Sequence, residues 1–174
     1  RKAQSVKTLY ESLLARFNAI SARAVRALIV VMVLVMTCAL AAQVSLRYGM
    51  NITLSWSEEL SLGLFTWTVL LSSALGVHEG YHVRMALVLD TLPKGSRRES
   101  ERLIHLATVA VGIFLAWAGW RYVADTRGSV SAAIGYPIEL LHASAFVCGV
   151  LIALYALESA LRGRVDEPAP IDPD

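Results

Sequence analysis

Four long apolar runs are the feature that most limits the folds open to this chain. They cover residues 27–46, 60–77, 103–120 and 140–157. Each run is long enough to cross a hydrocarbon core of about 30 Å at about 1.5 Å per helical residue. A mean hydropathy of +0.54 with only 17% charged residues is too apolar for a soluble domain of 174 residues. The sequence therefore predicts an all-α integral membrane protein with four transmembrane helices.

The positions of lysine and arginine predict how these helices are oriented. Thirteen of the 16 basic residues lie before the first run, between the second and third, or after the fourth. The other three are Arg47, Arg121 and Arg127. Because positive charge collects on cytoplasmic flanks, we predict that both termini are cytoplasmic. The net charge of +2 is modest and carried by these flanks, so nucleic acid is not expected as a partner.

The segments outside the runs divide the chain. Residues 1–23 are predicted to form an amphipathic helix in the inner membrane interface, because apolar side chains recur on one helical face: Val6, Leu9, Tyr10, Leu13, Leu14, Phe17 and Ile20. Residues 24–160 form the transmembrane domain, with the short apolar segment 83–92 along the inner surface. The acidic, proline-containing tail 161–174 is expected to be disordered. We expect no cleavable signal peptide, and the Arg1 start leads us to expect preceding residues.

A polar hinge at residues 47–59 joins the first two runs and carries Arg47, Glu58 and Glu59. Ionisable groups at a membrane boundary cost free energy unless they pair, snorkel or face a partner. We hypothesise that Arg47 pairs with one of the two glutamates, or that the carboxylates face another chain. Ser55 and Glu58 match a capping box, with Ser57 as a competing N-cap. Ser96 and Glu99 match a second box, which would start a helix that runs unbroken into the third span.

Two sets of residues suggest other chemistry. The segment from His78 to His82 fits H-E-x-x-H, in which two histidines bind zinc and the glutamate is a general base. Histidines on facing helices of a four-helix protein could instead ligate haem. The ordinary interpretation is that the four histidines bond to backbone or headgroups at the membrane interface. Small residues are predicted to let helices approach closely: Gly112, Ala116 and Gly119.

The hinge also carries a family resemblance. A first span ending in Arg47-Tyr48, a short outer loop and a second span opening Trp56-Ser57-Glu58-Glu59 resemble the small membrane subunit, the DctQ-like Q subunit, of TRAP (tripartite ATP-independent periplasmic) transporters. The match continues through Trp67, Gly76, His82-Val83-Arg84 and Leu92-Pro93, and covers roughly residues 27–137.

The resemblance implies a non-enzymatic, cofactor-free scaffold subunit of a sodium-driven importer for organic acids, such as C4-dicarboxylates or sialic acid. Its partners would be a large multi-span membrane subunit, a periplasmic binding protein and the lipids of a bacterial or archaeal inner membrane. The positions expected to matter for structure or for the partner interface are those of the matched motifs: Arg47, Tyr48, Trp56, Glu58, Glu59, His82 and Arg84.

Overall fold

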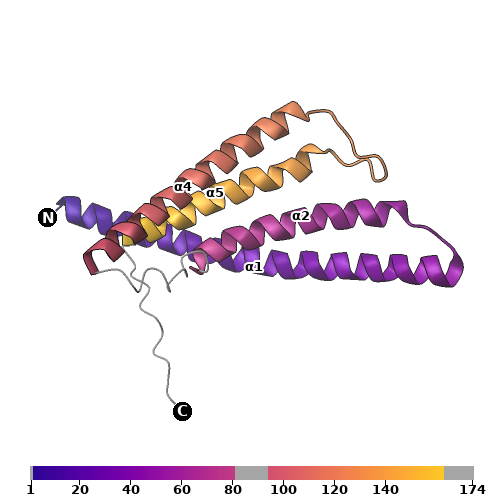
Figure 1. The fold of residues 1–174 in the computed structure, drawn as a ribbon, viewed down its shortest axis with the longest axis horizontal. Coiled ribbons are helices and arrows are strands. Elements are labelled where there is room, and N and C mark those ends of the chain that lie inside the picture. The colour runs from indigo at the N-terminus through magenta and orange to yellow at the C-terminus, as the bar shows by residue number, and fades with distance from the viewer. Residues whose placement is uncertain (1, 81–93, 163–174) are drawn as a thin grey trace, which may run out of the picture.

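The computed structural model describes residues 2–80 and 94–162, and these are almost entirely helical (Figure 1). The helices are α1 (Lys2–Met50), α2 (Ser55–His78), α4 (Lys94–Asp125) and α5 (Glu139–Arg162). Each contains a stretch long and apolar enough to cross a membrane. All four predicted runs fall inside these helices, so the all-α, four-span architecture is confirmed. Segment 83–92 and the tail beyond residue 162 lie outside the described residues.

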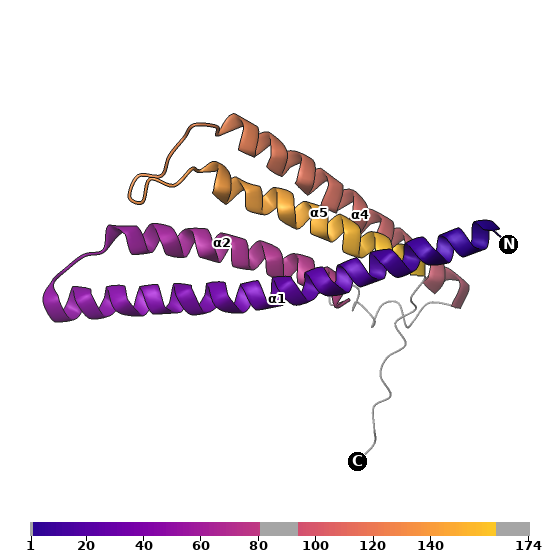
Figure 2. The same ribbon diagram turned by 180° about the vertical axis from the view of Figure 1, so that it is seen from behind.

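The helices form two antiparallel hairpins, α1 with α2 and α4 with α5. The hairpins meet at the end that holds the N-terminus, which we name the inner end. They splay apart toward the two loops that connect the paired helices, and we name that end the outer end (Figures 1 and 2). Side chains of α4, Val109 and Leu115, pack against a core whose buried members come from α1, α2 and α5: Ala22, Ala74, Val77, Cys148, Ile152, Tyr155 and Ala156. The C-terminal end of α5 lies at the inner end of the bundle.

Helices α4 and α5 are held close by glycine on both sides of their contact. A Cβ atom on Gly112 would come within 2.6 Å of the Ala153 backbone nitrogen, and one on Gly149 within 2.8 Å of the Ala116 Cα. Real Cβ atoms do not approach backbone so closely, so only glycine fits at these two positions. The predicted strip of small residues on the third span is therefore confirmed as a helix-packing surface.

Helix α1 differs from the prediction for residues 1–23. It passes through residue 23 without a break, so the amphipathic stretch and the first span form one helix. The apolar face predicted to anchor it is open, with Phe17 56% and Ile20 63% exposed, whereas Asn18, Ala22 and Val25 on the opposite face are buried. Whether this part of α1 lies in the membrane interface stays a prediction.

The C-terminus of α1 ends in a left-handed residue. Asn51 has φ +56°, and the Ile52 N–H donates to the Leu46 carbonyl at 3.2 Å. This bond satisfies one of the carbonyls at the end of the helix, and a left-handed residue just past the last turn is a common way for a helix to end. Glycine usually occupies that position, and asparagine is the common substitute.

The effect of a substitution at Asn51 on stability should depend on how readily the new residue adopts a positive φ. Asn51→Val is expected to destabilise the protein by about 1–2 kcal/mol, because a β-branched residue resists positive φ. Asn51→Gly should cost nothing. Thermal unfolding of the two variants in the same detergent checks this, and equal loss of stability in both would show that the Asn51 side chain, not its φ, matters.

Candidate functional site

The outer end of the molecule is organised around Glu59, in the first two turns of α2. Its carboxylate accepts hydrogen bonds from three successive backbone N–H groups, those of Ala132 (3.1 Å), Ala133 (3.0 Å) and Ile134 (2.8 Å). Successive N–H groups that converge on one anion form a nest, and bonds to an ionised acceptor are the stronger kind. Glu59 therefore ties the start of α2 to the loop between α4 and α5.

That loop, residues 126–138, has an ordered backbone of its own. Val130 and Pro137 form an isolated antiparallel bridge, and the Ser131 N–H donates to the Tyr136 carbonyl at 2.9 Å. Gly128 and Gly135 have φ near +79° and +78°, conformations that other residues rarely adopt. The Gly128 N–H also donates to the Glu139 carboxylate at 2.8 Å. The loop is thus a small folded cap, and Glu59 fastens it.

Arg47 does not take part in this arrangement, so the hypothesis that it pairs with Glu58 or Glu59 is wrong for this structure. Glu58 accepts a hydrogen bond from the Gln43 amide at 2.9 Å, and Glu59 is occupied by the loop. Within the described residues, no ion pair joins Arg47 to a carboxylate. Arg47 lies in the last turn of α1, where a cation is favoured by the helix dipole.

The predicted capping box at the start of α2 is also wrong. The N-cap is Leu54, which makes no side-chain capping bond. The Ser57 hydroxyl donates instead to the Leu54 carbonyl at 2.7 Å. The Glu58 carboxylate points toward α1 to meet Gln43, so it is not available to reach back to the cap. The side chains of the second predicted box, Ser96 and Glu99, lie outside the described residues, but α4 does run unbroken into its span.

The inner end holds a buried polar cluster that the sequence interpretation missed. Asn18 of α1 is fully buried, and its amide nitrogen donates to the Glu158 carboxylate at 2.6 Å and to the Leu154 carbonyl at 3.2 Å. One turn later, the hydroxyls of Ser21 and Tyr155 are 3.0 Å apart. Polar contacts of this kind hold helices together where the surroundings are apolar.

The spacing of the four polar residues along the sequence could have predicted this cluster. Asn18 and Ser21 are three residues apart in α1, and Tyr155 and Glu158 are three apart in α5, so each pair lies on one helical face. The predicted fourth span ended at residue 157, one residue before Glu158. The cluster fixes where α1 crosses α5 and has the character of a structural tie.

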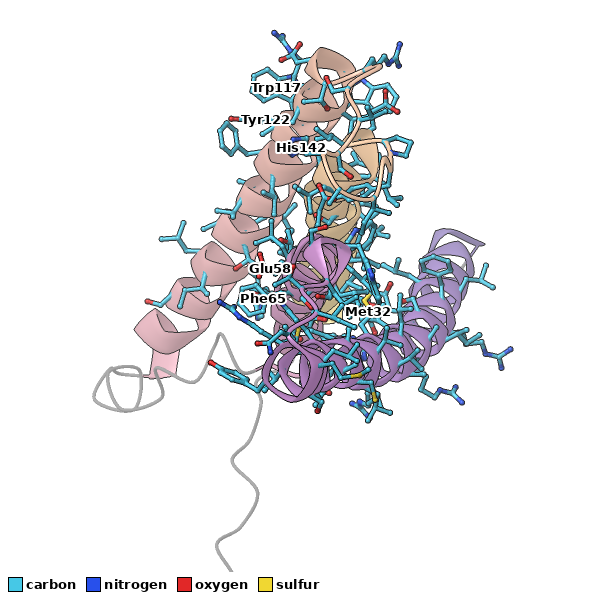
Figure 3. All side chains as sticks on the ribbon, turned by 90° about the vertical axis from the view of Figure 1, so that its right-hand side faces the viewer. Met32, Glu58, Phe65, Trp117, Tyr122 and His142 are labelled. Carbon is cyan, nitrogen blue, oxygen red and sulfur yellow. The ribbon has the colours of Figure 1, made fainter. Side chains whose placement is uncertain are left out.

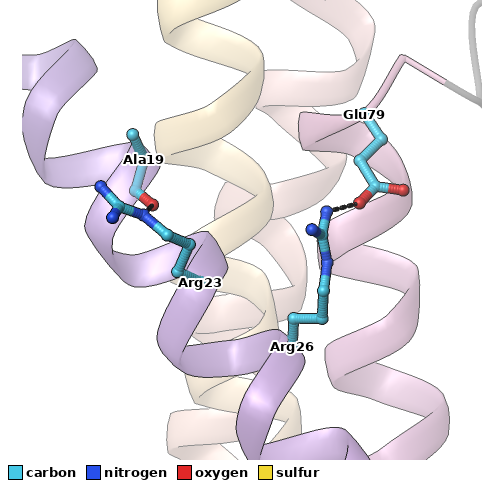
Figure 4. Close-up of polar contacts among 4 residues, drawn as sticks. All are labelled: Ala19, Arg23, Arg26 and Glu79. Atoms are coloured by element: carbon cyan, nitrogen blue, oxygen red, sulfur yellow. Dashed lines mark hydrogen bonds and ion pairs between the residues drawn. The ribbon is translucent and has the colours of Figure 1, made fainter.

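The described residues of the predicted zinc-binding motif make other contacts in the structure. Glu79 forms an ion pair with Arg26 of α1, so its carboxylate is engaged by a guanidinium (Figure 4). The same view shows Arg23 turned away, with its Nε donating to the Ala19 carbonyl at 3.3 Å. In the part of the chain that the structure describes, no three histidine, cysteine or acidic side chains gather as metal ligands. His82 and Arg84 lie outside that part.

Two of the four histidines considered as haem ligands, His78 and His142, lie far apart in the structure. The His78 ring packs on Tyr155 with centroids 4.8 Å apart, and the His142 ring packs on Tyr122 at 5.2 Å. Tyr155 and His142 both lie on α5, thirteen residues apart, which is about 20 Å along a helix. His78 and His142 therefore cannot ligate one iron. Tyr122 and His142 belong to an aromatic group at the outer end of α4 and α5, seen with Trp117 in Figure 3.

The sequence profile of one protein family matches residues 36–165, which is more than half of the chain. Its description is tripartite ATP-independent periplasmic transporters, DctQ component. The chain belongs to the DctQ family. The resemblance found at the hinge is thereby confirmed. A DctQ component is a membrane subunit of a transporter and not an enzyme, so the protease interpretation is set aside.

Two relatives of this DctQ chain carry names of the same kind. The ectoine TRAP transporter small permease protein TeaB of Halomonas elongata is 30% identical over 112 residues, which are 63% of this chain and 58% of TeaB. The C4-dicarboxylate TRAP transporter small permease protein DctQ of Vibrio cholerae is 26% identical over 87 residues, which are 50% of this chain and 38% of that protein. The matches thus span little more than half of TeaB and less of the Vibrio protein.

Proposed function

We propose that this DctQ chain is a static scaffold subunit of a sodium-coupled importer for organic acids, such as C4-dicarboxylates or sialic acid. The observation that carries the proposal is the family match over residues 36–165. The two relatives are named for different solutes, ectoine and C4-dicarboxylate. That difference supports a division of labour in which other chains choose the solute and this one supports them.

The spans favour a supporting role, because they offer no path for a polar solute. A transport route through a helix bundle is marked by ionisable side chains or broken helices near the midplane. In the described helices, charged residues stand only toward the ends: none lies between Arg26 and Arg47, or between Glu139 and Glu158. We therefore assign the moving, solute-binding part to a large multi-span membrane subunit, supplied by a periplasmic binding protein.

The outer half of α1 is the surface that we assign to the large subunit. Cys38, Ala41 and Ser45 share one face of α1 and are exposed, which leaves a shallow strip where another helix could pack closely. Tyr48, 81% exposed, continues this face, and the side chains of Arg47 and Trp56 are also exposed at this end of the molecule. The outer half of α4 is different, because it carries the amphipathic aromatics typical of a lipid boundary: Trp117, Trp120 and Tyr122.

The orientation follows from charge. The N-terminal end of α1 and the C-terminal end of α5 lie at one end of the bundle. In the sequence, thirteen of the 16 basic residues precede the first span, separate the second from the third, or follow the fourth, which supports placing that end in the cytoplasm of a bacterial or archaeal cell. The Glu59-fastened loop would then face the periplasm, on the side from which a binding protein approaches.

Recovery of the complex from its native membrane in mild detergent tests the proposal. We expect a large multi-span chain at a one-to-one ratio, and sodium-dependent solute uptake when the pair is reconstituted with its binding protein. Ala41→Trp should reduce co-recovery, because the indole holds the partner helix away. Ala110→Trp, the same change at an exposed position on α4, should not. A chain that is always recovered alone would contradict the scaffold role.

A further inference from the structure

A cavity of about 440 Å³ lies where the two hairpins splay apart. Its walls come from three helices and the outer loop, and include Leu28, Met32, Leu64, Trp67, Ile134 and Leu141. The residues on α2 share one face, since Leu60, Leu64 and Trp67 follow helical spacing. Figure 3 labels Met32 on the side of α1 toward α5, and Phe65 on the other side of α2. Among the residues that the structure describes, no charged side chain contributes to the walls.

The polar atoms near this cavity leave little for a polar ligand to bind. The Trp67 indole N–H, the one nitrogen donor among the wall side chains, already donates to the Leu140 carbonyl at 3.2 Å. The Tyr136 hydroxyl turns toward α2 and lies 4.0 Å from where a Cβ of Gly63 would stand. A solute with several hydrogen-bonding groups would lose its water without finding partners. The occupant must therefore be mostly apolar.

The surroundings supply one apolar material in abundance. Leu28, Met32 and Leu64 lie well inside helices that are long and apolar enough to cross a membrane, so the medium beside the opening is hydrocarbon. An unfilled cavity of this size forfeits the dispersion contacts of every side chain that lines it. In a bilayer, such a cavity is expected to be filled.

The walls also determine what shape can enter. A helix is about 10–12 Å across with its side chains, and close helix docking in lipid needs small residues at the contact. The walls here are mainly leucine, methionine and tryptophan, and glycine occurs only at Gly63. A flexible, linear chain can thread between such side chains. The amphipathic rings of Trp67 and Tyr136 are of the type found where acyl chains meet headgroups.

We propose that the cavity between α1, α2 and α5 binds one acyl chain of a membrane phospholipid. The chain occupies the space between the splayed hairpins and packs against the Trp67 ring. The lipid thereby completes the apolar core at the outer end, where the two hairpins diverge. The site requires only that the protein is embedded in a bilayer, so it does not depend on the solute or on the partner proteins.

Fluorescence quenching of Trp67 by phosphatidylcholine that is brominated near the middle of its chains tests the site. Trp56, Trp117 and Trp120 are replaced by phenylalanine, and the protein is measured in vesicles, alone and with the co-recovered large subunit. We expect strong quenching of Trp67 in both preparations. Leu28→Phe fills the cavity and should remove at least half of the quenching. Leu62→Phe, the same change on the opposite face of α2, should leave it unchanged.

A second substitution and a reference fluorophore keep the test decisive. Gly63→Leu fills the cavity from α2 and should act like Leu28→Phe. A protein that keeps only Trp117, which is 58% exposed on α4, reports bulk lipid and should not respond to either change. Trp67 quenching that is insensitive to both cavity-filling changes would overturn the proposal. So would quenching that disappears when the large subunit is bound, because a partner side chain would then be the occupant.

Discussion

Glu59→Ala is expected to release the loop between α4 and α5, while Glu58→Ala leaves it in place. The Glu59 carboxylate accepts hydrogen bonds from three backbone N–H groups of that loop, whereas Glu58, within the described part of the chain, accepts one only from the Gln43 amide. Alanine would leave all three donors without their acceptor. Hydrogen exchange of the Ala132, Ala133 and Ile134 amides should therefore accelerate, on the order of tenfold or more, since exchange reports local opening.

The neighbouring glutamate is the matched control for this prediction. Both glutamates stand in the first turns of α2 and carry the same charge near the helix N-terminus, so a change that came only from the helix dipole would appear in both variants. Glu59→Gln should give an intermediate result, because the amide keeps one acceptor oxygen but turns an NH₂ group toward the donors. Equal exchange in Glu58→Ala and Glu59→Ala would show that the nest does not hold the loop.

The helices of this protein were predictable because length and hydropathy alone determine them. A run such as residues 27–46 must be helical in a bilayer, where every backbone group needs an internal partner. The close packing of α4 on α5 could also be predicted from the sequence, because Gly112 and Gly119 lie on one face of α4. There was no reason in the sequence to end a helix at residue 23, because nothing in the amphipathic stretch is helix-breaking, and α1 continues through it.

The polar contacts were harder to predict because the sequence does not identify which groups bind each polar side chain. The groups that bind Glu59 are backbone N–H groups, which every residue except proline carries, and they lie more than seventy positions away. Charge alone suggested Arg47, the nearest cation along the chain. Asn18 and Glu158 meet only because α1 crosses α5, and that crossing depends on the packing of the buried residues around them.

Gly149→Leu is expected to separate α4 from α5, the closest-packed pair of helices in the described chain. A Cβ atom at this position would lie 2.7 Å from the Gly112 carbonyl oxygen and 2.8 Å from the Ala116 Cα. Both neighbours are backbone atoms of a helix, so neither can turn aside. Even Gly149→Ala should destabilise the protein by about 1–3 kcal/mol, the usual range for overpacking, and the leucine should cost more.

The control is Gly49→Ala, an identical change near the end of α1 where no atom lies within 4 Å of the new methyl group. There, alanine should stabilise the helix by about 0.5–1 kcal/mol, because glycine loses more backbone entropy on folding.

Thermal unfolding in one detergent compares the stabilities of the two alanine variants. The distance between spin labels at Val111 and Val150 reports the separation of α4 from α5 in the leucine variant. If both alanine variants are more stable than the original protein, helix propensity dominates at these glycines. Opposite shifts with a longer label distance in Gly149→Leu are the result expected if backbone contact holds the second hairpin together.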